Sequence, residues 1–225
     1  MPATRRTAIL SALLASALTT SACAGSSSST PGAAASSSAA ASTPSATAST
    51  PATAGSSTAP ATDPQAERIL AAHGLQGLDA VTIIERLDAL RVDQRPANLM
   101  ASVRPTELLV SDRSGEPVAV PIPGDRFYLS MAPYAQQTHD CHFHSLTTCL
   151  GELRNATVHV TVQRVDTGEV IVDKDATTYD NGFVGVWLPR GIDATVRIEH
   201  DGRTATRQVR TGAQDATCLT TVKLT

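Results

Sequence analysis

The sequence predicts a mainly β protein, in which an antiparallel β-sandwich-like domain follows a small α-helical hairpin. Three observations support this fold class. Two short helical patterns lie between residues 63 and 100, apolar and polar residues alternate from about residue 101 onward, and turn signals divide that second region into many short segments. Alternation with period two is typical of half-buried strands, and strands separated by turns every 8–12 residues or so favour a sandwich.

The first 23 residues are predicted to be a lipoprotein signal peptide. Arg5 and Arg6 form a charged start, and the apolar run from Ala8 to Leu18 is far shorter than the ~20 residues of a membrane-spanning helix. Small residues then lead to Cys23 in a segment that resembles a bacterial lipobox, although Thr20 stands where Leu or Val is usual. We expect Cys23 to carry the lipid and anchor the protein outside the cell. An ordinary signal peptide cleaved nearby is the alternative.

Residues 24–62 consist almost wholly of Ser, Ala, Thr, Pro and Gly, so they are predicted to be a disordered tether. A flexible chain of about 40 residues reaches roughly 35 Å. The remaining residues, about 160, are enough for one or two small domains. We expect a helical subdomain over residues 63–100 and a β-rich domain over residues 101–225.

Composition excludes some classes of function. The net charge of -3 and the aromatic content of 3% argue against nucleic-acid binding. Once Cys23 is assigned to the lipid, three of the 4 cysteines remain. In an extracytoplasmic protein disulfides persist, but an odd number leaves at least one thiol free, bound to a metal or paired with another molecule.

The helical hairpin has clear start and stop signals. Asp63 followed by Pro64 predicts the start of a first helix, which Gly74 ends. Asp79 is predicted to cap a second helix, which stops before Pro96. The apolar stripe of that second helix comprises Val81, Ile84, Leu87 and Leu90.

The strands that follow are predicted from alternation and from turn residues such as those at 112–115, 166–168, 180–182 and 201–202. The candidate strands are residues 107–111, 118–122, 127–131, 157–165, 170–173, 182–188, 195–199, 204–209 and 219–224.

Chemistry concentrates in residues 138–149. This run contains Cys141 and Cys149, and it also holds three of the 6 histidines: His139, His142 and His144. The third available thiol, Cys218, lies near the C-terminus. Thiolate and imidazole together suit soft or borderline metals, above all Cu(I) and Zn(II).

The sequence leaves two conformations open for residues 138–149. Asp140 could cap a short helix from Cys141 to Leu150, which would favour the thiolate of Cys141 and place His144 on the same face. Cys149 would then be about 12 Å away along the helix, whereas two thiolates on one metal lie within roughly 4.6 Å. Either the segment is a bent loop, or Cys218 joins one of the other two thiols.

A purely structural explanation competes with the metal site. Two of the three thiols could form a disulfide that holds the segment to the C-terminal strand. Such a disulfide would explain neither the leftover thiol nor the nearby histidines. The remaining histidines are not expected to be ligands: His73 at a helix end, His159 in a strand and His200 beside a turn.

The chain resembles the CueP family of bacterial extracytoplasmic copper-binding proteins, and the similarity covers essentially everything after the tether. The segments that carry it are residues 99–105 (LMASVRP), 127–134 (FYLSMAPY), 138–153 (from THDC through CLGEL), 178–190 (TYDNGFVGVWLPR) and 217–221 (TCLTT). By position, the resemblance implies copper ligands at Cys141, His144, Cys149 and Cys218. His139 and His142 are second-tier candidates, and His142 stands where an apolar or aromatic residue is expected.

These observations predict a lipid-anchored copper-binding protein for copper homeostasis or tolerance, with Cu(I) favoured and zinc as the alternative metal. A thiol pair could also reduce Cu(II), but no dedicated enzymatic activity is indicated. The expected partners are the copper ion, the membrane and a copper-accepting protein. The rival functions are thiol–disulfide exchange, which the absence of a C-x-x-C motif opposes, and a stapled β-sandwich that binds another protein.

Overall fold

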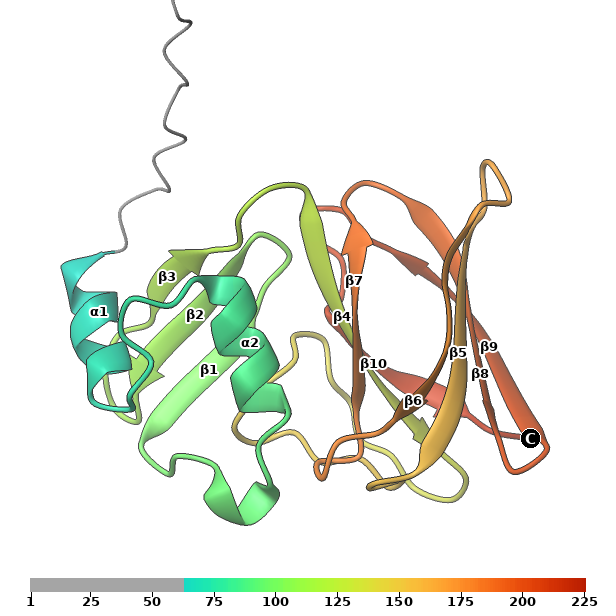
Figure 1. The fold of residues 1–225 in the computed structure, drawn as a ribbon, viewed down its shortest axis with the longest axis horizontal. Coiled ribbons are helices and arrows are strands. Elements are labelled where there is room, and N and C mark those ends of the chain that lie inside the picture. The colour runs from blue at the N-terminus through green and yellow to red at the C-terminus, as the bar shows by residue number, and fades with distance from the viewer. Residues whose placement is uncertain (1–62) are drawn as a thin grey trace, which may run out of the picture. The chain divides into compact units, whose positions relative to one another are not determined.

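The computed structural model describes residues 63–225, which contain two α-helices, one 3-10 helix and ten strands (Figure 1). The helical elements are α1 (Pro64–Ala71), α2 (Ala80–Asp88) and η1 (Val92–Gln94). The strands are β1 (Leu99–Val103), β2 (Glu107–Asp112), β3 (Val118–Pro121), β4 (Arg126–Tyr134), β5 (Thr157–Arg164), β6 (Val170–Thr177), β7 (Val184–Pro189), β8 (Asp193–His200), β9 (Arg203–Arg210) and β10 (Cys218–Lys223). The predicted mainly β fold is therefore confirmed.

The predictions for the signal peptide, Cys23 and the tether fall outside the described residues and stay predictions. Within residues 63–225, the two helices are too short to serve as membrane spans.

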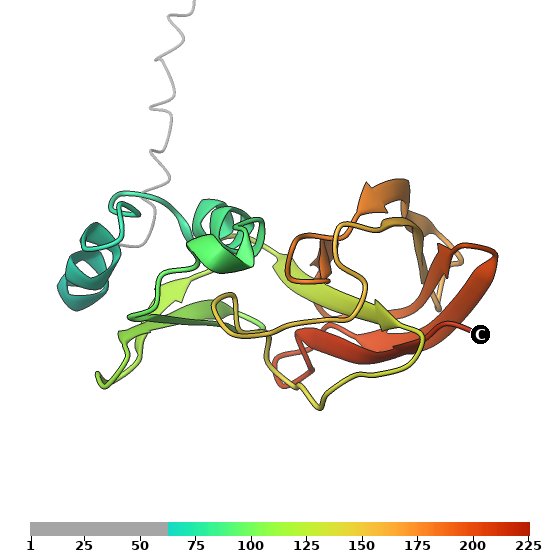
Figure 2. The ribbon, with the colours of Figure 1, turned by 90° about the horizontal axis from the view of Figure 1, so that it is seen from below.

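Both helices begin at the residues that the sequence indicates. The Asp63 carboxylate accepts a hydrogen bond of 2.6 Å from the backbone N–H of Gln65, and Asp79 accepts one of 2.8 Å from Thr82. These carboxylates satisfy backbone donors that the first turn of a helix leaves unpaired. Both helices lie along one face of the sheet β1-β2-β3 (Figures 1 and 2). Their apolar residues form one core with those of the sheet.

The other strands form two sheets around a second core. One sheet has the order β10-β4-β7 and the other β6-β5-β8-β9. Val158, Val160 and Val162 of β5 alternate inward and meet Leu129 and Met131 of β4 in this core. Every pair in the four-stranded sheet is antiparallel. The pair β10–β4 is parallel, which the long connection between these strands permits.

Strand β4 takes part in both cores. Tyr128 points into the core under the helices, whereas Phe127, Leu129 and Met131 belong to the sandwich core. This alternation makes β4 the shared wall between the two halves. Sequence reasoning missed β1, although Leu99, Ala101 and Val103 alternate as its buried residues, because the strand is short and the apolar Met100 stands at an exposed position between them.

Candidate metal centre

The run that holds the cysteines and histidines is a bent loop between β4 and β5. Its backbone pairs with neighbouring strands: the N–H of Val103 donates to the carbonyl of His144 (2.8 Å), and the N–H of Leu146 donates to Ala101 (2.9 Å). The N–H of Cys218 also donates to the carbonyl of His142 (3.2 Å). Of the two alternatives left open by the sequence, the helix from Cys141 to Leu150 is therefore wrong, because these long-range bonds replace the helical ones.

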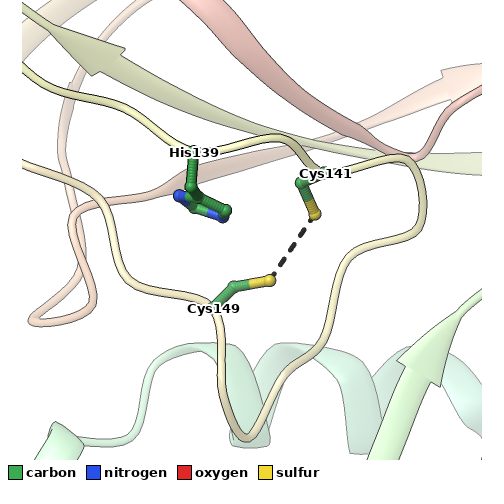
Figure 3. A group of neighbouring side chains, drawn as sticks. All are labelled: His139, Cys141 and Cys149. Carbon is green, nitrogen blue, oxygen red and sulfur yellow. Dashed lines mark hydrogen bonds between the residues drawn. The ribbon is translucent and has the colours of Figure 1, made fainter.

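The bent loop brings together the sulfur atoms of the three cysteines within residues 63–225. Cys141 and Cys218 form a disulfide with a Cα–Cα distance of 5.7 Å, which ties the loop to β10. Cys149 is a free, partly buried thiol whose Sγ lies 3.6 Å from the Sγ of Cys141. Figure 3 shows Cys141 and His139 on one limb of the loop and Cys149 on the other, with the two sulfurs turned toward each other. Both arrangements left open by the sequence, the bent loop and the recruitment of Cys218, occur together.

His144 lies at the buried end of this cluster, with no exposed surface. Its Nε2 is 3.0 Å from Oδ1 of Asp88, and its Nδ1 is 3.9 Å from the sulfur of Cys218. The ring packs against Phe183 with a centroid distance of 4.6 Å. One imidazole nitrogen therefore faces a carboxylate and the other faces sulfur.

Asp88, the last residue of α2, is the centre of a buried hydrogen-bond network. Its carboxylate accepts hydrogen bonds from the Tyr128 hydroxyl (2.7 Å) and the Asn181 amide (2.7 Å), and Ser130 Oγ lies 3.4 Å away. All four residues are at most 2% exposed. A buried carboxylate needs such partners to remain ionised.

Sequence reasoning missed this network, although one signal was present. Asp88 follows Ile84 by four residues and Val81 by seven, so it falls on the apolar face of α2. A charged residue on a buried helix face indicates a buried partner. Nothing local in the sequence points to Tyr128 or Asn181.

The charges of the cluster depend on one another. Burial opposes protonation of His144, but the charge and hydrogen bond of Asp88, together with Cys149, outweigh it and raise the pKa of His144 to about 9. Burial alone would raise the pKa of Asp88, yet His144 and the hydroxyl and amide donors lower it. Burial likewise opposes the Cys149 thiolate, while His144, the Ser145 N–H and then Arg95 lower its pKa. The site therefore favours an ion pair and a thiolate.

Arg95 adds positive charge next to this thiolate. Its Nη1 donates to the carbonyl oxygen of Cys149 (2.8 Å), while Nε and Nη2 are buried without a hydrogen-bond partner in the structure. Arg95 comes directly after η1, which places it over the loop.

Two groups of side chains within residues 63–225 could hold a metal ion. In each, the ligand atoms all lie within 4.8 Å of one another: His139, Cys141 and Cys149 form one group, and His144, Cys149 and Cys218 form the other. His142 belongs to neither, because its exposed ring stacks edge-on against Phe143. His159 instead lies between the carboxylates of Asp173 and Asp175 on an exposed face.

Thiols and imidazoles at these separations suit a soft metal ion, and a free thiol beside a disulfide suits thiol chemistry. The comparisons with known proteins support binding of a soft metal ion. The family described as "Periplasmic copper-binding protein CueP" matches residues 82–223. A crystal structure of a protein named S.CueP is 39% identical, covers 73% of this chain and 100% of its own, and superposes with a TM-score of 0.67. No curated protein matches the chain significantly. The chain belongs to the CueP family.

Proposed function

We propose that this protein binds copper outside the cytoplasm, as Cu(I), through Cys149, His144 and the sulfurs released when the Cys141–Cys218 disulfide is reduced. The observation that carries the proposal is that the Cys149 and Cys218 sulfurs lie within 4.8 Å of an imidazole nitrogen of His144, which a buried carboxylate holds in place. The disulfide joins Cys141 to the same cluster. Membership of a family of periplasmic copper-binding proteins supports the compartment and the metal.

The ligand chemistry favours copper in its reduced state. Thiolates are soft ligands that select Cu(I), and a disulfide offers no thiolate, so tight binding requires two electrons from a thiol reductant. Asp88 faces Nε2 of His144 and leaves Nδ1 toward the sulfurs. A carboxylate in this position fixes the orientation of a metal-binding imidazole and increases its basicity.

The same thiols could supply electrons to Cu(II). Oxidation of Cys141 and Cys218 to the disulfide releases two electrons and two protons, which would reduce two Cu(II) ions to Cu(I). The disulfide seen here would then be the product of that reaction. This role is an extension of copper binding and not a separate site.

Competition with a chromogenic Cu(I) chelator tests the proposal on the full chain in detergent. The reduced protein should bind Cu(I) far more tightly than Zn(II), and the oxidised protein should bind it weakly. Cys149→Ser and His144→Ala should each lower the Cu(I) affinity at least about tenfold, a loss of roughly 1.4 kcal/mol. His159→Ala is the matched control, because that histidine lies outside both ligand groups. Unchanged affinity in the triple Cys141, Cys149 and Cys218 to Ser variant would refute the proposal.

Thiol–disulfide exchange is the second candidate, and one observation favours it. The free sulfur of Cys149 lies 3.6 Å from a sulfur of the disulfide. Attack by the Cys149 thiolate on Cys141 would form a new disulfide and release Cys218 as the leaving thiolate. Alkylation of free thiols followed by peptide mapping would detect this exchange. Label found on Cys149 alone, at every pH and time, would exclude it.

Lipid anchoring completes the proposal. If Cys23 is lipidated, the tether of residues 24–62 would hold the copper-binding unit near the outer face of the membrane, where it would meet copper and a copper-accepting protein. The proposed role is copper homeostasis or tolerance.

A further inference from the structure

We propose that copper occupies two successive positions that share Cys149: an outer position set by His139 and Cys141, and an inner position set by His144 and Cys218. The inference rests on the proposed function and divides its ligands between two stages: Cys141 holds the ion only at entry, and His144 and Cys218 hold it at its final site. It assigns His139 a role in uptake and release that differs from the role of His144.

The outer position is open to solvent. His139 and Cys141 are partly exposed, and His139 lines a shallow groove with Gln137, Thr138, Leu150, Gly151 and Glu152. The groove therefore ends at a potential ligand. Figure 3 shows the His139 imidazole on the same side of the loop as the two sulfurs. The ligand atoms of all three residues lie within 4.8 Å of one another. An ion that enters along the groove meets these donors first.

The inner position is closed to solvent. His144 is 0% exposed and Cys218 is 2% exposed. An ion in solvent therefore has no direct access to them, and the partly exposed Cys149 is the accessible member of this group. Cys149 belongs to both ligand groups, so it can keep hold of the ion while the other donors change.

Transfer between the positions is then a ligand exchange without a redox step. Copper stays Cu(I), the sulfur of Cys149 stays bound, and the bonds to His139 and Cys141 break as those to His144 and Cys218 form. Reduction of the Cys141–Cys218 disulfide supplies one thiolate to each position. One disulfide therefore closes both positions at once. Because both groups use the same sulfur, we expect one copper ion per chain.

Stopped-flow transfer of Cu(I) between a chromophoric chelator and the reduced full chain in detergent tests this order. His139→Asn should slow uptake and release together, each by about tenfold or more, because it removes a donor on the path in both directions. His144→Asn should lower equilibrium affinity at least about tenfold, mainly through faster release. His142→Asn is the matched control on the same loop and should change neither rate.

Three results would overturn the inference. An equal loss of affinity in His139→Asn and His144→Asn would mean that both imidazoles bind one ion at the same time. Unchanged rates in His139→Asn would mean that the ion bypasses the outer position. Two copper ions per chain would mean that the positions fill together. If the wild-type protein itself takes up no copper, the proposed function fails, and that result is distinct from all three.

Discussion

At the level of single residues, the site depends on how Asp88 and His144 share charge. Both side chains are fully buried, and each stabilises the ionised form of the other. Removing one partner of such a pair leaves an uncompensated buried charge, which costs far more than the pair itself contributes. The pair therefore links the stability of the fold to the protonation state of His144, the proposed copper ligand.

Asp88→Asn should destabilise the apo protein by roughly 3 kcal/mol near pH 6, and the loss should shrink as pH rises toward 9. The pKa of His144 is raised from 6.5 to about 9, so its contribution is complete below pH 6.5 and is lost as pH rises through the folded value. Denaturant unfolding of wild type and variant across pH 6–9.5 or so measures the difference.

The control for this experiment is Asp93→Asn, which breaks the exposed ion pair with Arg91. Exposed pairs contribute little, so this variant should unfold like the wild type at every pH. A difference between wild type and Asp88→Asn that stays constant across the pH range would contradict the assignment.

The Cys149 thiol should react with iodoacetamide at a pH midpoint below its ordinary value of 9.0 in oxidised protein. Burial opposes the thiolate, but His144 and the N–H of Ser145 outweigh it and lower the pKa. His144→Ala should move the midpoint upward, while His142→Ala should not. The measurement is the alkylation rate against pH in a Cys23→Ser background. Equal midpoints in the three proteins would show that His144 does not stabilise the thiolate.

The candidate ligands could be named from the sequence, whereas most of the residues that position them could not. Cys141, His144 and Cys149 stand out because thiols and imidazoles are rare here and lie close together in the chain. Asp88 lies 56 residues from His144 in the sequence. The only signal that it has a buried partner is its position on the apolar face of α2. No comparable sequence signal points to Tyr128, because tyrosine is common in strands.

At the level of elements, some structures are determined by interactions between residues close in the sequence, and others by contacts between residues far apart in the sequence. The starts of α1 and α2 could be predicted because Asp63 and Asp79 bond to backbone groups two and three residues away. The loop around Cys141 could not, because β1 and β10 take its hydrogen bonds from distant parts of the chain. The parallel pairing of β10 with β4 is likewise a long-range choice.

The pairing of β4 with β7 sets the position of the Tyr128 hydroxyl that donates to Asp88. In this ladder Ser130 lies opposite Gly185, and a Cβ on Gly185 would overlap the Tyr128 hydroxyl and ring. Gly185→Ala should therefore destabilise the protein by about 1–3 kcal/mol and also weaken copper binding. Thermal or denaturant unfolding and chelator competition measure the two effects.

Two further variants show whether the effect comes through Tyr128. Tyr128→Phe removes the hydrogen bond to Asp88, so it has a cost of its own. Because it also removes the overlapping hydroxyl, the double variant with Gly185→Ala should lose less stability than the sum of the two single losses. Gly115→Ala is the control, since its new Cβ would make only ordinary contacts with Asp112, the nearest at 3.6 Å. Strictly additive losses in the double variant would contradict this explanation.

At the level of the whole molecule, the cluster lies where the two cores meet. Tyr128 and Leu146 pack in the core under the helices. Cys218 is the first residue of β10, which belongs to a sheet of the second core. The Cys141–Cys218 disulfide closes a sequence separation of 77 residues across this junction. The disulfide that joins the two halves therefore uses thiols that are also proposed copper ligands.

Cys218→Ser should lower the stability of the oxidised protein by roughly 2–4 kcal/mol and change the reduced protein much less. The disulfide restricts the unfolded chain only when it is formed, which is why the two redox states should differ. Cys149→Ser is the control, because Cys149 is free in this structure. Unfolding in urea with and without reductant gives both values. An equal loss in both states would assign Cys218 a packing role instead.

Residues 1–62 are predicted to attach the whole chain to the membrane. The apolar run from Ala8 to Leu18 is too short to span a bilayer, so stable attachment would depend on lipid at Cys23. Cys23→Ser should move the protein from the membrane fraction to the soluble fraction, because no helix of residues 63–225 can hold it in the bilayer. Fractionation after cell lysis, with immunodetection of the copper-binding unit, measures this shift. Cys149→Ser is the matched control and should remain with the membrane, and a Cys23→Ser protein that stays fully membrane-bound would refute lipid anchoring.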